Sequence, residues 1–181
     1  MRGLGLRRWR MAPALIALGI FLLLLSGCPF SSDHPLSDPA SALPEKALVG
    51  QWRMQDPDDG EWHTLSILPF DEHQMVAVTV ENDRGKVSGF RLFVTAVGPE
   101  RFLNLQELGT SDPAWFFARF EVDQDHLRLQ IVDDTLFEKR SFASAAELTA
   151  FVRAHLSDPR LYAAEDEKPS VATLERVAAQ P

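Results

Sequence analysis

Acidic and histidine side chains form two small groups that could support acid–base chemistry. Asp71, Glu72 and His73 are consecutive, and Asp133 and Asp134 are adjacent further along the chain. A hydrolase that uses general acid–base catalysis needs two carboxylates, or a carboxylate and a histidine, in one pocket. Both groups come where an apolar run ends, as solvated turn residues do, and nothing in their spacing brings them together. The pattern therefore favours turns over a catalytic pair.

The second kind of site for which the sequence offers suitable residues is a metal site. Residues 56–60 read Asp-Pro-Asp-Asp-Gly and are followed by His63, so they offer oxygen and nitrogen ligands. A calcium-binding EF-hand loop needs alternating oxygen ligands and a distant glutamate, which this segment lacks, whereas its composition is that of a hairpin turn. His126 and His155 are dispersed, and the chain has no His-x-x-x-His pair and no Gly-x-Ser-x-Gly motif. The sequence predicts no catalytic residue, no metal site and no cofactor.

Composition restricts the class of protein and of partner. The 181 residues carry a formal net charge of −8, although four arginines lie within the first ten residues. The rest of the chain is therefore more acidic still, and its scattered Lys and Arg residues argue against nucleic acid as a partner. The single cysteine allows no intramolecular disulfide and no multi-cysteine metal site. With 45% hydrophobic and 24% charged residues, the chain has the composition of one globular domain.

The first 28 residues have the organisation of an export signal. Four arginines precede an apolar run from position 14 to 25, which has the length of a signal-peptide core and falls short of the ~20 residues of a membrane-spanning helix. The run ends in Leu25-Ser26-Gly27-Cys28, which resembles the lipobox of bacterial lipoproteins. This resemblance implies that a signal peptidase recognises Leu25, Ser26 and Gly27, that residues 1–27 are removed, and that the Cys28 thiol carries diacylglycerol. Retention of the run as an uncleaved anchor is the alternative.

The lipobox also predicts a location and a tether. Two or three acyl chains on Cys28 would hold the protein durably on a membrane of the cell envelope. The next residue is Pro29 rather than the aspartate associated with inner-membrane retention, which implies the outer membrane, facing the periplasm. From Pro29 to Glu45 the chain is rich in Pro, Ser and Asp and has no strand or helix period. Residues 28–45 are therefore predicted to be the lipidated cysteine and a flexible tether, and residues 46–181 a single domain.

Alternating apolar residues predict an antiparallel meander of strands. Leu127, Leu129 and Ile131, for example, alternate with polar residues, which is the pattern of a strand with one buried face. Turn sequences rich in Asp, Asn, Gly and Pro separate the runs. The predicted strands are 50–54, 62–68, 75–80, 90–96, 102–106, 116–122 and 127–131, with 171–177 as a last strand.

One helix is predicted before the last strand. Ser144 and Glu147 have the spacing of a capping box, and Leu148, Phe151 and Val152 belong to one apolar stripe. The sequence thus predicts a helix near 144–156 that covers an open end or an edge of the sheet. The predicted fold class is mainly β, with seven or eight antiparallel strands in a small barrel and one C-terminal helix packed on it.

The two ends of the domain carry a resemblance to a known family. Gly50-Gln51-Trp52 is similar to the Gly-X-Trp motif that opens lipocalins and related small barrels, although the chain lacks the paired cysteines common in lipocalins. The resemblance implies a barrel floor at which Gly50 permits close backbone approach and Trp52 packs against an arginine of the final strand, here Arg176. The opening Leu-Val-Gly-X-Trp and the segment Phe102-Leu103-Asn104-Leu105 also resemble a group of small uncharacterised bacterial proteins. Neither resemblance assigns an activity, because fold does not fix function.

Three functions stay open at this point. A noncatalytic binding module that recognises an envelope protein or an apolar ligand agrees best with an anchored, acidic domain without a catalytic motif. A lipocalin-like carrier of a lipid or other apolar ligand requires a hollow barrel, whereas the aromatic residues of the strands could equally fill it. A periplasmic hydrolase requires the dispersed Asp and His residues to converge.

Overall fold

The computed structural model describes residues 29–55, 60–80, 87–137, 140–163 and 171–178. In this part of the chain, α2 spans Ala145–Ala154, and the short 3₁₀ helices η1, η2 and η3 span Pro39–Ser41, Lys46–Leu48 and Pro159–Leu161. The strands are β1 (Ser31–Ser32), β2 (Gly50–Gln55), β3 (Trp62–Pro69), β4 (Met75–Val80), β5 (Val87–Val97), β6 (Glu100–Glu107), β7 (Trp115–Val122), β8 (His126–Ile131) and β9 (Ala172–Arg176). No helix among these residues has the length and hydropathy that a membrane span requires.

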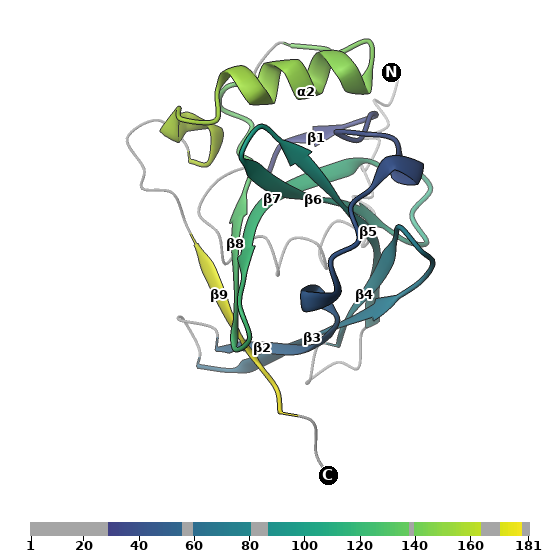
Figure 1. The fold of residues 1–181 in the computed structure, drawn as a ribbon, viewed down its shortest axis with the longest axis vertical. Coiled ribbons are helices and arrows are strands. Elements are labelled where there is room, and N and C mark those ends of the chain that lie inside the picture. Colours follow the sequence, from purple (N-terminus) through teal and green to yellow (C-terminus); the bar gives the residue numbers. More distant parts are fainter. Residues whose placement is uncertain (1–28, 56–59, 81–86, 138–139, 164–170, 179–181) are drawn as a thin grey trace, which may run out of the picture.

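Strands β2 to β9 form a closed antiparallel barrel of eight strands (Figure 1). Each strand pairs with the next along the chain, and β9 pairs with both β8 and β2, which closes the ring. The two-residue strand β1 lies outside the ring and pairs with β7. The predicted fold class is confirmed: the protein is mainly β, with an antiparallel barrel and a helix packed on it.

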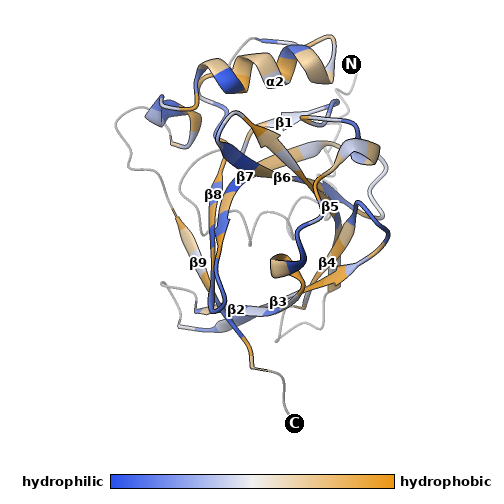
Figure 2. Ribbon diagram, viewed as in Figure 1, coloured by the Kyte–Doolittle hydropathy of each residue, from blue (hydrophilic) through white to orange (hydrophobic). Residues whose placement is uncertain are grey.

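Alternation along the strands fills the interior of the barrel. On β3, Leu65 and Ile67 are buried, whereas Ser66 between them is not, because successive side chains of a strand point to opposite faces. Hydrophobic and hydrophilic colours accordingly succeed one another along the strands (Figure 2). The buried interior residues are Leu48, Trp52, Met54, Leu65, Ile67, Met75, Ala77, Phe90, Leu92, Val94, Leu103, Ala118, Phe120, Leu127, Leu129, Ala172 and Leu174.

A second apolar core lies outside the barrel wall. On β5, Leu92, Phe93 and Val94 are all buried, so buried and exposed residues do not alternate there. Leu92 and Val94 face the barrel interior, whereas Phe93 faces outward into the second core. Helix α2 packs its Leu148 and Val152 into this outer core. The predicted helix is present, but it covers the outer wall rather than an open end or edge of the sheet, because the outward aromatic side chains provide the apolar surface for its stripe. The buried members of the outer core are Phe30, Leu36, Ala42, Phe93, Val97, Phe102, Trp115, Phe117, Val132, Phe137, Leu148, Val152, Leu161 and Tyr162.

The segment from Pro29 to Glu45 is packed on the barrel, in contrast to the predicted flexible tether. Phe30, Leu36 and Ala42 are buried in the outer core, at 8%, 2% and 5% exposure. The backbone N–H of Leu36 donates a 2.7 Å hydrogen bond to Oδ1 of Asn104 on β6, and the hydroxyl of Thr149 on α2 donates to the Leu36 carbonyl. Three apolar side chains at irregular spacing have no periodic pattern. Only their tertiary contacts therefore identify the segment as part of the fold.

Candidate functional site

The structure brings together the three residues that the lipocalin resemblance grouped. The Arg176 guanidinium carbon lies 4.0 Å from the centre of the Trp52 ring. Trp52 is fully buried, and its indole N–H donates a 2.8 Å hydrogen bond to the Leu48 carbonyl. A cation over the face of a desolvated indole is a favourable contact of ~1–2 kcal/mol. The sequence placed these residues at the two ends of the domain, and the pairing of Trp52 with Arg176 across β2 and β9 makes them neighbours.

Gly50 makes room for this contact. Its φ of +142° lies in a region that favours glycine, and a Cβ at this position would lie 2.7 Å from Nη1 of Arg176. The backbone of β2 can therefore approach the guanidinium only because residue 50 has no side chain.

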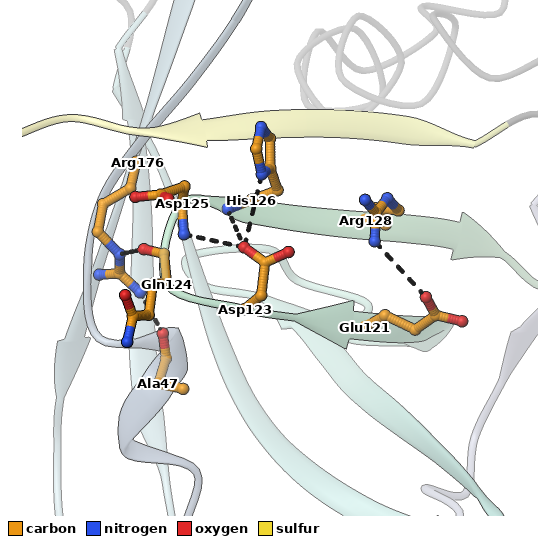
Figure 3. Close-up of polar contacts among 8 residues, drawn as sticks. All are labelled: Ala47, Glu121, Asp123, Gln124, Asp125, His126, Arg128 and Arg176. Carbon is orange, nitrogen blue, oxygen red and sulfur yellow. Dashed lines mark hydrogen bonds and ion pairs between the residues drawn. The ribbon is translucent and has the colours of Figure 1, made fainter.

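Arg176 also ties three chain segments together at this end of the barrel (Figure 3). Its guanidinium donates hydrogen bonds to the carbonyls of Ala47 and Gln124, at 2.6 Å each. A third, which Figure 3 does not draw, goes to the carbonyl of Val49 at 3.0 Å. Ala47 belongs to η2, whose Leu48 is buried in the barrel interior. The arginine thus fastens η2 beneath the barrel and helps to close it. We call Gly50, Trp52 and Arg176 the barrel floor.

The turn between β7 and β8 presents the Gln124 carbonyl to Arg176. Its geometry is held by the Asp123 carboxylate, which accepts the backbone N–H groups of Asp125 (2.9 Å) and His126 (2.7 Å) (Figure 3). These hydrogen bonds, the one from Asp125 first, lower the pKa of Asp123. His126 Nδ1 also lies 3.5 Å from the same carboxylate. His126 is thus the first residue of β8, and among the described residues its ring lies beside Asp123 of the preceding turn.

The barrel interior is filled by its own side chains. A cavity of about 30 Å³ remains, and its walls are apolar, with Leu65, Phe90, Leu103 and Leu129 among them. That volume is close to the ~30 Å³ that one water molecule occupies in the liquid, whereas small-molecule pockets have ~300–1,000 Å³. Of the two interiors that the sequence left open, the packing of the described residues agrees with the filled core.

The two acidic groups predicted from the sequence do not converge. Asp71 caps the turn between β3 and β4, where its carboxylate accepts the backbone N–H groups of His73 (2.8 Å) and Gln74 (2.7 Å). These hydrogen bonds, the one from His73 first, lower the pKa of Asp71. Asp133 follows β8, is 3% exposed and accepts the backbone N–H of Thr135 (2.9 Å). Strands β2 and β9 separate the two turns in the ring, so the carboxylates form no pair.

His63 and His155 are also dispersed. His63 lies on β3, and His155 caps α2, with its Nδ1 2.8 Å from the Phe151 carbonyl. No group of His, Cys, Asp and Glu side chains suited to a metal ion occurs in the described part of the chain. Residues 56–59, which carry the aspartates of the metal hypothesis, lie outside it, as do Leu25, Ser26, Gly27 and Cys28 of the lipobox.

Asn104 is a buried polar residue for which the sequence suggested no role. It is completely buried on β6, and its side-chain amide donates to the Thr95 hydroxyl (2.9 Å) and to the Phe93 carbonyl (3.3 Å). Its carbonyl oxygen accepts the backbone N–H of Leu36, and Ser37 contacts Thr95 through their hydroxyl groups (2.6 Å). The sequence signal for this role was the asparagine between apolar residues in Phe-Leu-Asn-Leu. An amide side chain that is buried at such a position requires hydrogen-bond partners. Its partners bind the N-terminal segment to the wall.

Exposed apolar side chains gather on the outer wall around β4. Val80 and Val87 pair across β4 and β5 and are 44% and 63% exposed. Leu68 pairs with Val76 across β3 and β4, and Leu108 packs beside Gly89, the partner of Val78 on β5. In the ring of eight strands, β4 lies opposite β8. We call this surface the β4 face, and it comprises the exposed Leu68, Val80, Val87 and Leu108 together with the half-buried Val76 and Val78.

Comparison with known proteins gives no match to a family model, a curated protein or a solved structure. The class that the fold defines is therefore a closed and filled eight-stranded β-barrel with an outer layer formed by α2 and the N-terminal segment.

Proposed function

We propose that the protein is a lipid-anchored lipoprotein of the bacterial envelope whose barrel is a noncatalytic module that binds another envelope protein. One observation supports the anchor: Pro29 and Phe30, which follow the lipobox directly, pack on the barrel. Pro29 forms a β-bridge with Asp133, and the Phe30 ring lies 3.7 Å from that of Phe137. Cleavage before Cys28 would therefore remove none of the residues that pack in the described fold.

The absence of convergent chemistry in the described residues supports a binding role rather than a hydrolase. Asp71, Asp123 and Asp133 each accept backbone N–H groups in their own turns. Carboxylates that cap turns in this way are held for structure, and a hydrolase would need two of them to face one pocket.

The β4 face supports a protein as the partner. The first residues after the anchor lie at β7 and β8, because β1 pairs with β7 and Pro29 bridges Asp133, two residues beyond β8, whereas β4 lies opposite β8 in the ring. The apolar side chains of the β4 face thus lie across the ring from Pro29 and β1, the part of the segment nearest the anchor. An apolar patch in that position suits another protein rather than the leaflet that holds the acyl chains.

Replacement of Cys28 tests the anchor. In cells grown with a labelled fatty acid, the wild-type protein should incorporate label and lose the mass of residues 1–27, since the lipobox thiol is the acyl acceptor. Cys28→Ser should incorporate none and retain those residues, whereas Ser41→Ala, at an exposed position outside the lipobox, should behave as wild type. The chain has no other cysteine, so label that persists in Cys28→Ser, or an unacylated wild-type protein, would refute the anchor.

Crosslinking in intact cells tests the binding module. A photoreactive residue at Val87 should yield one discrete adduct with an envelope protein, and Val80→Lys should abolish the adduct because it places a charge in the β4 face. A photoreactive residue at Thr173, exposed on β9, is the matched control and should yield none. An adduct from Thr173 as strong as that from Val87, or none from either, would contradict a partner at the β4 face.

A carrier of an apolar ligand is the second candidate, and the barrel floor favours it. Gly50, Trp52 and Arg176 are arranged as the resemblance to lipocalins implies. The 30 Å³ cavity weighs against it, because a lipid would have to displace the interior side chains. If the barrel carries a lipid, native mass spectrometry of the mature protein should find a co-retained lipid of defined stoichiometry, and Leu129→Trp, which fills the cavity, should remove it. A wild-type protein without co-retained lipid would contradict the carrier.

A further inference from the structure

A small polar hollow lies beside β1. It has a volume of about 210 Å³ and is lined by Phe30, Ser31, Ser32, Asp33, Ala114, Arg140, Ser141 and Phe142. This is about seven times the ~30 Å³ of one water molecule and below the ~300 Å³ at which pockets begin to enclose drug-sized molecules. We call it the N-terminal hollow, and its size suits a small polar group.

The hollow lies close to the lipobox cysteine along the chain. Phe30 and Ser31 follow Cys28 by two and three residues, and an extended chain spans at most ~3.6 Å per residue. The wall of the hollow is therefore within about 7–11 Å of the residue that carries the acyl chains in the proposed function. The polar layer of each leaflet is ~5–8 Å deep. Anchoring at Cys28 thus brings the hollow to the level of the lipid headgroups.

The hollow offers one positive and one negative group. The Arg140 guanidinium lies 4.8 Å from the centre of the Phe151 ring, and the backbone N–H of Arg140 donates a 2.9 Å hydrogen bond to the Phe137 carbonyl. The hydrogen bond fixes the backbone of Arg140, and the ring contact holds its exposed side chain. In the described part of the chain, Arg140 and Asp33 form no ion pair with each other, although both line the hollow. The hydroxyls of Ser31 and Ser141 add further hydrogen-bonding groups.

We propose that the N-terminal hollow binds the phosphoethanolamine headgroup of a phospholipid in the leaflet that holds the anchor. The guanidinium of Arg140 and the serine hydroxyls donate to the phosphate, and the Asp33 carboxylate accepts from the ammonium group. A zwitterionic headgroup matches the paired charges of the hollow, whereas an anionic headgroup would leave Asp33 facing negative charge and the acidic domain repelled. This inference takes the position of the membrane from the proposed function, whereas the chemistry of the hollow does not depend on that function.

Native mass spectrometry of the full lipoprotein in a maltoside detergent tests the site. Titration with phosphatidylethanolamine should give a saturable single adduct, with affinity about tenfold above that for phosphatidylcholine, whose quaternary ammonium has no N–H to donate. Arg140→Gln should weaken the adduct by about tenfold, and Asp33→Asn should remove the preference for ethanolamine over choline. Arg153→Gln, at an exposed arginine of α2 outside the hollow, is the matched control and should leave both values unchanged.

Two further results would overturn the site. Equal adducts with ethanolamine and choline lipids in the wild-type protein would exclude headgroup recognition. Adducts that persist in Arg140→Gln while glycerophosphoethanolamine, which lacks acyl chains, fails to bind would indicate capture of acyl chains instead. Because these titrations are made in detergent, they measure the hollow independently of the anchor, which the fatty-acid label on Cys28 reports separately.

Discussion

Replacement of Arg176 by Met should destabilise the barrel by about 3 kcal/mol. Met retains an unbranched side chain but removes the cation over the buried Trp52 ring, a contact of ~1–2 kcal/mol at a desolvated site. It also removes the hydrogen bonds to the carbonyls of Ala47, Val49 and Gln124. These contribute ~0.5–1 kcal/mol each, at the lower end because two of them are exposed. The loss also frees η2 from the floor.

Urea unfolding of the mature protein, followed by tryptophan fluorescence, measures this loss. With a slope of ~2 kcal/mol per M for a small protein, a change of 3 kcal/mol lowers the unfolding midpoint by about 1.5 M. Arg53→Met is the matched control on the neighbouring strand, because Arg53 also stacks on an indole, that of Trp62, at 4.5 Å and pairs with Glu175 at 3.3 Å. Arg53 and Glu175 are about half exposed, so their contacts contribute less than ~1 kcal/mol.

The comparison of the two variants decides whether the floor has the role assigned to it. A midpoint shift in Arg176→Met no larger than that in Arg53→Met would refute the reasoning. Arg176 would then be a surface residue whose carbonyl contacts exchange with water at no cost.

Two other perturbations test the outer core. Asn104→Ala should lower the free energy of unfolding by ~2–4 kcal/mol, since it leaves the Leu36 N–H and the Thr95 hydroxyl without their buried partner. Hydrogen exchange of the Leu36 amide should accelerate. Unchanged exchange there would contradict the role of the network. Tyr162 is the only tyrosine of the chain, and burial raises its pKa above the ordinary 10.0. Its contribution to stability is therefore complete below pH 10 and is lost as the pH rises through the folded-state pKa. Tyrosinate absorbance should titrate at higher pH in the native than in the urea-unfolded protein, and coincident titrations would show that the ring is solvated.

The regular elements of the barrel followed from local pattern. Alternation such as Leu127, Leu129, Ile131 has the period of a strand, and turns rich in Asp and Gly separate such runs, so strand positions were predicted within a few residues. The capping spacing of Ser144 and Glu147 likewise predicted α2, and the Ser144 hydroxyl accepts the backbone N–H of Glu147 in the structure. These features depend on neighbours in sequence, which is why the sequence by itself determined them.

The N-terminal segment, the site of the helix and the state of the interior depended on tertiary structure. Phe30 and Leu36 lie among prolines and serines without a period, and they are buried only because β5, β6 and β7 turn Phe93, Phe102 and Phe117 outward. A filled barrel differs from a hollow one by the volumes of side chains that meet from distant strands, which no local pattern encodes. The sequence alone thus determined a barrel with one helix, and it predicts a lipobox before them. The three-dimensional packing decided that the segment from Pro29 to Glu45 is bound to the barrel.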